Sequence, residues 1–215
     1  MSIVTKAVSV VHPEFAHIVA CQEKLQSMIG PYGASPYAIS EFLDSLDHNT
    51  RLACTRSLSG SHLKRLYDMV AGFKKITIDD VCPPSAGVLK EVRNYGKNSL
   101  PLFSIFEKRF ARPSEGAKEL WGYNFAPLLP IIGPGYFVAR DAADRGEIDV
   151  DYYSVPPVQP DIADWPKLQP NEQGLSKLVY AYMVDKVRGV SKNVNIGRAW
   201  KQGKIQPAWF ILCRE

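Results

Sequence analysis

The chain has 215 residues, of which 46% are hydrophobic and 22% charged, and its formal net charge is +4. This composition is typical of a globular protein with a sizeable core, and it excludes the disordered and low-complexity classes. No apolar run approaches the ~18 residues that a membrane-spanning helix needs, so we expect no membrane partner.

The first residues and the cysteines indicate a cytoplasmic protein. The segment Met1–Lys6 lacks the basic region, apolar run and cleavage site of a signal peptide. The four cysteines lie far apart and form no C-x-x-C pair, a pattern that favours reduced, buried thiols over a disulfide framework. They are Cys21, Cys54, Cys82 and Cys213. We therefore expect cytoplasmic localisation.

Charge is distributed unevenly along the second half of the chain. Residues 141–172 contain eight acids against two bases, whereas residues 177–204 contain seven bases against Asp185 alone. Adjacent blocks of opposite sign favour pairing within the fold, and the basic block lacks the exposed aromatic pattern of an RNA-binding module. We therefore do not expect a nucleic-acid partner.

Residues 1–75 predict a bundle of four short helices. Pro13 is suited to the first position of a helix that Gly30-Pro31 ends, and Ser35-Pro36 begins a second helix. Asp47 or Asn49 can cap a third helix, and Ser59 or Ser61 a fourth that ends near Gly72. Each segment carries apolar residues at helical spacing, which predicts a compact bundle.

Residues 76–118 form a transitional segment. Prolines and small polar residues bracket a predicted short helix near residues 87–95. The run 102–110 fits two templates, because Leu102, Phe106 and Phe110 share a helical face and also alternate as in a strand. Between helix and strand, we favour a helix.

Residues 119–215 predict an antiparallel sheet with one principal helix. Strands are expected at Leu120–Tyr123, Tyr136–Arg140 and Glu147–Val155, and the hairpin Val194–Trp200 with Ala208–Cys213 follows later. Between them, apolar residues at helical spacing predict a helix over Gly174–Arg188. The predicted fold class is α+β, with the helical bundle packed on a sheet that carries this helix, and the three parts can form one compact domain.

The alternation in residues 147–152 predicts which side chains face inward. Ile148, Val150 and Tyr152 are expected on the dry face, and Glu147, Asp149 and Asp151 on the opposite face.

No motif predicts a metal, cofactor or nucleophile. Glu14, His17 and Cys21 share a predicted helical face, but no second cluster supplies the remaining ligands of a zinc site. The serines of residues 57–61 lie between helices, where capping is expected. Residues 96–99 lack the earlier glycine of a phosphate-binding loop.

The aromatic residues and the sequence Gly133-Pro134-Gly135 carry the only indication of a site. All four tryptophans follow residue 120, and aromatics at such density fill a core or line a cavity. The glycine-proline segment either turns the chain rigidly into a strand or makes residues 124–135 the rim of a pocket. If the pocket exists, its ligand-binding residues are predicted to be Trp121, Tyr123, Asn124, Tyr136, Arg140 and Tyr152.

The functional hypothesis is that the protein binds a small apolar or aromatic molecule between sheet and helix. One alternative is an interaction protein or homodimer that uses the helical bundle as its contact surface. Another is an enzyme of unknown reaction, for which Asp151 and Tyr152 are the candidate acid–base pair, although one strand places these two side chains on opposite faces.

Overall fold

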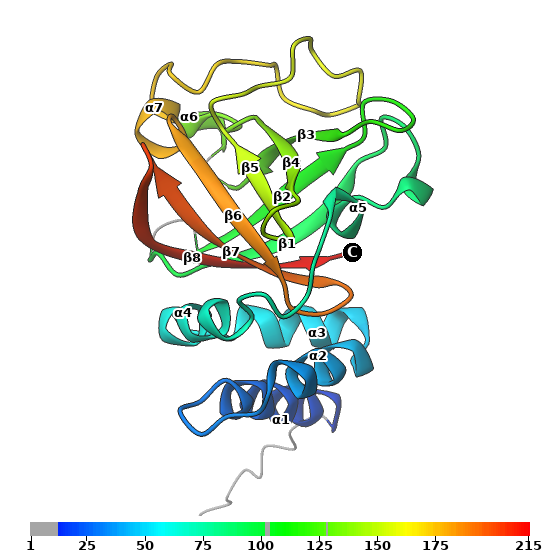
Figure 1. Cartoon of the computed structure of the whole chain (residues 1–215), viewed down its shortest axis with the longest axis vertical. Coiled ribbons are helices and arrows are strands. Elements are labelled where there is room, and N and C mark those ends of the chain that lie inside the picture. The colour runs from blue at the N-terminus through cyan, green and yellow to red at the C-terminus, as the bar shows by residue number, and fades with distance from the viewer. Residues whose placement is uncertain (1–12, 102–103, 128) are drawn as a thin grey trace, which may run out of the picture.

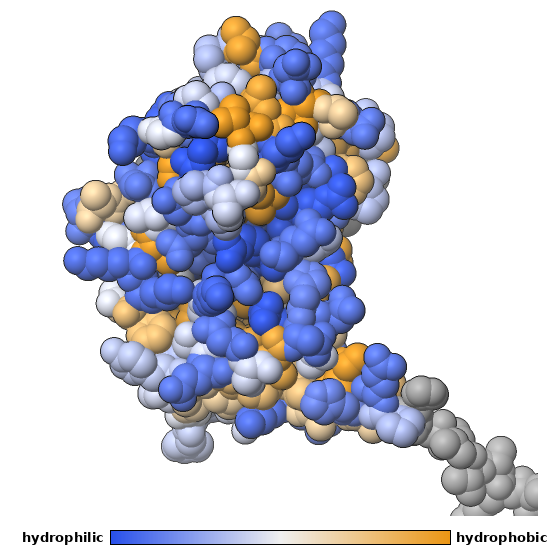
Figure 2. All heavy atoms as spheres, turned by 90° about the vertical axis from the view of Figure 1, so that its right-hand side faces the viewer, coloured by the Kyte–Doolittle hydropathy of each residue, from blue (hydrophilic) through white to orange (hydrophobic). Residues whose placement is uncertain are grey.

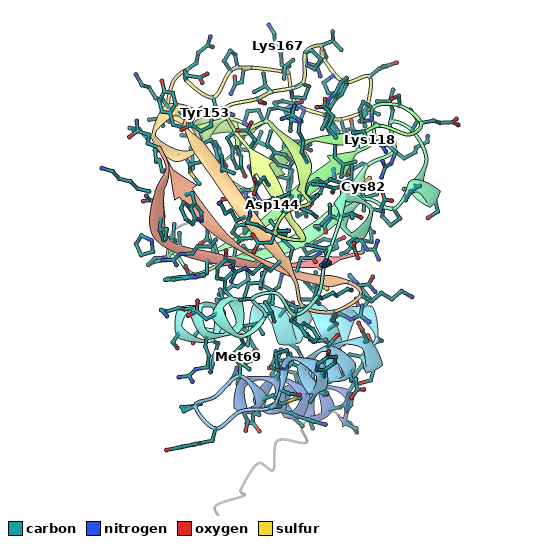
Figure 3. The ribbon with its side chains drawn as sticks, in the orientation of Figure 1. Met69, Cys82, Lys118, Asp144, Tyr153 and Lys167 are labelled. Atoms are coloured by element: carbon teal, nitrogen blue, oxygen red, sulfur yellow. The ribbon has the colours of Figure 1, made fainter. Side chains whose placement is uncertain are left out.

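The structure is a computed structural model, and it describes residues 13–101, 104–127 and 129–215. Figure 1 shows two parts: a β-barrel and a layer of helices packed against its outer wall. Met69 lies in the helical layer, whereas Lys167 lies in the long loop at the far end of the molecule (Figure 3). The protein is thus built from helices and an antiparallel sheet, as the α+β class predicts.

Four helices form the bundle, in agreement with the prediction for the first seventy-five residues. Ser35, Asp47 and Ser59 precede the second, third and fourth helices, and their side chains accept hydrogen bonds from backbone N–H groups of the first turn. The helices are α1 (Pro13–Met28), α2 (Pro36–Ser45), α3 (His48–Arg56) and α4 (Gly60–Met69).

Eight antiparallel strands form a closed barrel in which each strand pairs with its neighbour in sequence and the first strand pairs with the last. The sequence predicted an antiparallel sheet of about five strands, and the closed barrel of eight strands is a more specific architecture. Closure is favoured because it leaves no strand edge with unpaired N–H and C=O groups. The strands are β1 (Val92–Asn98), β2 (Ile105–Ala111), β3 (Glu119–Phe125), β4 (Phe137–Ala142), β5 (Glu147–Asp151), β6 (Met183–Gly189), β7 (Val194–Lys201) and β8 (Lys204–Arg214).

Three predicted helices are wrong. The helix expected near residues 87–95 does not form: a short 3₁₀ turn, η1 (Pro84–Ala86), ends before this segment, and β1 begins within it at Val92. The run 102–110 is strand from Ile105 onward, while residues 102–103 lie outside the described part of the chain. The helix expected over Gly174–Arg188 is only the four-residue α7 (Ser176–Val179), after which the chain continues as β6.

These three errors have one physical cause. In each case the strand is stabilised by ladder hydrogen bonds to strands on both sides, and these partners lie elsewhere in the sequence. Tertiary pairing of this kind overrides a short local periodicity. Consequently, among the residues that the structure describes, the sheet carries no principal helix of its own, and the long helices on its outer wall are those of the bundle.

One end of the barrel is closed by the segment that links the bundle to β1. This segment includes α5 (Ile78–Val81), and Ile76, Ile78 and Cys82 pack into the same buried cluster as the barrel interior. The backbone N–H of Ile78 donates to the Asp141 carboxylate (2.6 Å) and that of Ile76 to the Gly146 carbonyl (3.0 Å).

The opposite end of the barrel carries two short helices in its connections. These are α6 (Leu129–Ile132), between β3 and β4, and α7, between β5 and β6 (Figure 1). The chain therefore closes one end tightly and places loops and single helical turns at the other.

The bundle covers the wall made by β1, β7 and β8. Ile196, Ile211 and Cys213 point outward from the barrel into the core of the bundle, where they join Leu63 and Leu66 of α4. An ion pair between Glu147 and Arg188 (2.7 Å) joins the acidic and basic sequence blocks on the same outer surface. The face seen in Figure 2, on the side of α5, is mainly hydrophilic across its middle, with hydrophobic residues gathered toward its top.

Candidate functional site

A cavity of about 430 Å³ lies inside the barrel, toward the end that carries α6 and α7. Its walls are predominantly apolar, and a few polar side chains interrupt them. Members of both short helices line it, together with Leu100 of the β1–β2 connection and residues of β7 and β8 near the turn between these two strands. An eight-stranded barrel has room for its own side chains or for one small ligand, and this volume lies within the range of ligand pockets.

Four polar side chains meet in the middle of the barrel, at the inner wall of this cavity: Lys108, Asn124, Tyr152 and Asp185. Lys108 and Asn124 are register partners on β2 and β3, so their side chains leave the sheet side by side. Asp185 extends from β6, and Tyr152 directly follows β5. We call these four residues the polar cluster.

The hydrogen bonds of the polar cluster satisfy its central amine. Lys108 Nζ donates to Asn124 Oδ1 (3.0 Å) and to the Tyr152 hydroxyl, and it lies 2.9 Å from Asp185 Oδ2. An ammonium group has three donors, and here each has an acceptor. The Tyr152 hydroxyl donates in turn to Asp185 Oδ2 (3.2 Å). The cluster is therefore a buried ion pair that two neutral side chains hold in place.

Aromatic rings surround the same amine. Lys108 Nζ lies 5.0 to 5.7 Å from the ring centroids of Phe106, Phe137, Tyr152 and Phe210. Ring faces attract cations at such distances, and the effect grows when water is excluded. We call these four rings the aromatic cage.

Three glycines make room for three of the cage rings. Gly96, Gly122 and Gly197 are the cross-strand partners of Phe106, Phe137 and Phe210, respectively. A Cβ atom at any of the three would approach the partner ring to between 2.1 and 2.6 Å. Each ring therefore occupies space that only glycine leaves open, and this lets the rings gather around the amine.

Burial governs the ionisation of the cluster. It lowers the pKa of the Lys108 ammonium, and the nearby Asp185 carboxylate offsets only part of that effect. Burial, and then the Asp185 charge, raise the pKa of the Tyr152 hydroxyl well above its usual value. Tyr180 stacks on Tyr152 with ring centroids 5.6 Å apart, and burial raises the pKa of its hydroxyl to about 12. Both tyrosines are thus neutral at neutral pH.

Two of the six predicted ligand-binding residues, Asn124 and Tyr152, line the cavity. The structure brings them together directly, because Asn124 Nδ2 donates to the Tyr152 hydroxyl (3.0 Å). Ile148 and Val150 also face inward, as the alternation predicts.

The other four predicted residues lie outside the cavity. Tyr123 and Tyr136 pack under Trp165 in a separate cluster. The Trp121 indole donates to Glu119 (3.2 Å), and Arg140 forms an ion pair with the same carboxylate (2.7 Å). These four side chains lie on the outer face of the barrel, whereas Asn124 and Tyr152 lie on its inner face. The six predicted residues therefore do not form one site.

The segment Gly133-Pro134-Gly135 leads into β4, and it also helps to shape the cavity. The Pro134 carbonyl accepts from the Asn124 backbone N–H (2.8 Å), and the Gly135 carbonyl accepts from Asn124 Nδ2 (3.1 Å). These bonds orient the Asn124 side chain toward Lys108. Leu129 and Ile132, which precede the segment, line the cavity.

Sequence reasoning missed Lys108 and Asp185, because both lie in runs that were predicted to be helical. In the strand register, Lys108 lies between the inward-facing Phe106 and Phe110, and Asp185 lies between Met183 and Val187. A charged residue at an inward position of an apolar alternation is the signal that could have identified them. It becomes visible only once the segments are assigned as strands.

Within residues 13–101, 104–127 and 129–215, no group of three or more His, Cys, Asp or Glu side chains could hold a metal ion. His17 and Cys21 lie 3.7 Å apart (Nε2 to Sγ), but they have no third partner of this kind among the described residues. No helix in the same ranges is long and apolar enough to cross a membrane. No family model, curated protein or solved structure matches the chain.

Proposed function

We propose that the protein binds one small, largely apolar molecule inside the barrel, with the polar end of the ligand directed at the polar cluster. The observation that carries this proposal is the apolar cavity of about 430 Å³ with a hydrogen-bonded cluster at its inner wall. Ligand sites typically combine apolar walls with a few polar groups that fix orientation. The sequence-based hypothesis placed the ligand between sheet and helix, whereas the proposal now places it within the closed sheet.

The charge of the cluster restricts the polar end of the ligand. Lys108 and Asp185 are paired at 2.9 Å and neutralise each other. A carboxylate or ammonium on the ligand would bring an unpaired charge into a buried site, which is energetically costly. The proposed ligand therefore carries a neutral hydrogen-bonding group, such as a hydroxyl or a carbonyl.

Two variants, each with one alanine replaced by phenylalanine, test this proposal. Ala199 lines the cavity and is the cross-strand partner of Asp185, so Ala199→Phe places a ring directly above the polar cluster. Ala143, in the exposed β4–β5 turn at the other end of the barrel, gives the matched control Ala143→Phe. Binding of the neutral apolar fluorophore N-phenyl-1-naphthylamine is measured by titration.

We expect the wild type and Ala143→Phe to bind the fluorophore with equal affinity. Ala199→Phe should bind it at least about tenfold more weakly, a loss of about 1.4 kcal/mol. Equal binding by the two variants would place the fluorophore outside the barrel and would contradict the proposal.

The helical bundle supports the second candidate, a homodimer. Phe15, Tyr32 and Tyr37 are large aromatic residues of the bundle region, and all three are exposed. Large aromatic side chains on a protein surface are candidates for contacts with a second copy of the chain. Sedimentation of the wild type and of Phe15→Ser over a range of concentrations tests this alternative, and a monomer at all concentrations would exclude it.

A further inference from the structure

The Lys108 amine is a buried nucleophile. A site that only formed hydrogen bonds with a neutral ligand would not need an amine at this position. Lys108 is one of the residues that line the cavity, and its side chain is only 2% exposed. A glutamine or a tyrosine could offer a neutral ligand a hydrogen bond without an ion pair in the barrel. An amine, unlike these groups, can form a covalent bond with a carbonyl carbon.

We propose that Lys108 forms an imine with the carbonyl group of an apolar aldehyde or ketone held in the barrel cavity. This inference rests on the proposed function and names its ligand class. It is carried by three observations: the amine at the cavity wall, the carboxylate 2.9 Å from it, and the aromatic cage around it.

The neighbours of Lys108 can carry out each proton transfer that the reaction needs. The ammonium first passes a proton to the Asp185 carboxylate, either directly or through the Tyr152 hydroxyl, which contacts both groups. The neutral amine then attacks the carbonyl carbon, a C–N bond forms, and a proton shift from nitrogen to oxygen gives a neutral carbinolamine. Protonated Asp185 returns its proton to the hydroxyl, the C–O bond breaks, and water leaves.

The reaction is balanced without an oxidant or a reductant. An aldehyde and a lysine ammonium give a protonated imine and one water, and Asp185 ends as a carboxylate. The product is a cation, and it lies where Asp185 and the aromatic cage already surround positive charge. Because burial lowers the pKa of Lys108, its amine is also more readily deprotonated than a surface lysine.

The experiment uses trans-cinnamaldehyde as the probe and cinnamyl alcohol as its non-reactive analogue. The full-length protein is incubated near neutral pH with one equivalent of the aldehyde and sodium cyanoborohydride, which reduces an imine to a stable amine. Peptide mapping by mass spectrometry then locates the label. We expect more label on Lys108 than on all other lysines together, and we expect excess cinnamyl alcohol to remove the label from Lys108 alone.

Two variants supply the controls. Lys108→Arg keeps a cation opposite Asp185 but cannot form an imine, so it should lose the main label while other lysines react as before. Ala199→Phe keeps the amine but fills the space beside it, and it should lose the same label. The measurement on the wild type stands even if Lys108→Arg fails to fold.

The outcomes separate this inference from the proposed function. If cinnamyl alcohol binds in the cavity but the label appears only on surface lysines, the imine is excluded and the proposed function stands. If neither the alcohol nor the aldehyde binds in the cavity, both are overturned.

Discussion

Lys108 Nζ and Asp185 Oδ2 lie 2.9 Å apart in the middle of the barrel, and the two side chains are only 2% and 4% exposed. They come from β2 and β6, strands that are not neighbours in the sheet. The ion pair therefore spans the barrel interior and couples two parts of the wall. Desolvation makes such a pair costly to break, even where it adds little net stability.

Removing the amine should destabilise the fold strongly. Lys108→Met leaves the Asp185 carboxylate buried without its cation, and we expect a loss of about 3–5 kcal/mol in the free energy of unfolding. Urea denaturation measures the loss. The double variant Lys108→Met with Asp185→Leu should recover part of it, because no unpaired charge remains.

The exposed pair of Lys64 and Asp68 provides the control for this prediction. Its atoms are equally close, at 2.8 Å, but both side chains are more than half exposed. Lys64→Met should therefore change stability by less than about 1 kcal/mol. Similar losses for Lys64→Met and Lys108→Met would show that burial does not set the strength of the central pair.

An alanine at position 197 should disturb the aromatic cage. Its Cβ atom would lie 2.1 Å from the Phe210 ring, so the ring must move. Overpacking of this kind costs about 1–3 kcal/mol. Adding Phe210→Leu to Gly197→Ala should restore part of the stability, as measured by thermal unfolding.

Gly60 is the matched control, because a Cβ atom there would meet its nearest neighbour at an ordinary 3.4 Å. Gly60→Ala should be neutral or slightly stabilising, since alanine favours the helical conformation. If Gly197→Ala were as stable as Gly60→Ala, the cage rings would not depend on the inward-facing glycines.

The buried thiols should make the protein sensitive to alkali. Burial raises the pKa of Cys54 from 9.0 to about 12, and it raises those of Cys82 and Cys213 from 9.0 to about 11. Above pH 9 the unfolded chain releases these protons while the folded chain keeps them. Stability is therefore fully present below pH 9 and falls as the pH rises toward about 11–12.

Lys108 acts in the opposite direction, because its folded-state pKa is lowered below 10.5. Burial also raises the hydroxyl pKa values of Tyr152 and Tyr180, so these two groups act in the same direction as the three thiols, and we expect the net change to be a loss. Urea midpoints at pH 8 and pH 11 in the presence of a reducing agent measure it, and Cys54→Ala should show a smaller drop than the wild type. A midpoint that does not change between these pH values would refute the prediction.

The local parts of the fold could be predicted from the sequence because the signals for them are local. Ser35, Asp47 and Ser59 cap helices through atoms three residues away, and the sequence shows each pair directly. The β4–β5 hairpin was also predictable from local sequence. Its two strands are close together in the chain, and apolar and polar residues alternate along β5. In the site, the inward position of Tyr152 followed from this alternation.

The rest depended on pairing between distant segments. β1 pairs with β8, although nearly the whole sequence of the barrel separates these two strands along the chain. No local sequence pattern predicts this closure. The runs that became β2 and β6 also fit helical periodicity, so the inward direction of Lys108 and Asp185 was hidden. The outward direction of Tyr123 and Tyr136 was hidden too, because aromatic residues suit either side of a covered wall.

The sequence by itself therefore determined the helical bundle, the β4–β5 and β7–β8 hairpins and the presence of a dry aromatic face, because capping and alternation act over a few residues. Only the tertiary structure decided that the sheet closes, that an apolar cavity lies within it, and that Lys108 meets Asp185 there. Closure fixes the register of every strand, and the register determines which side chains share the interior.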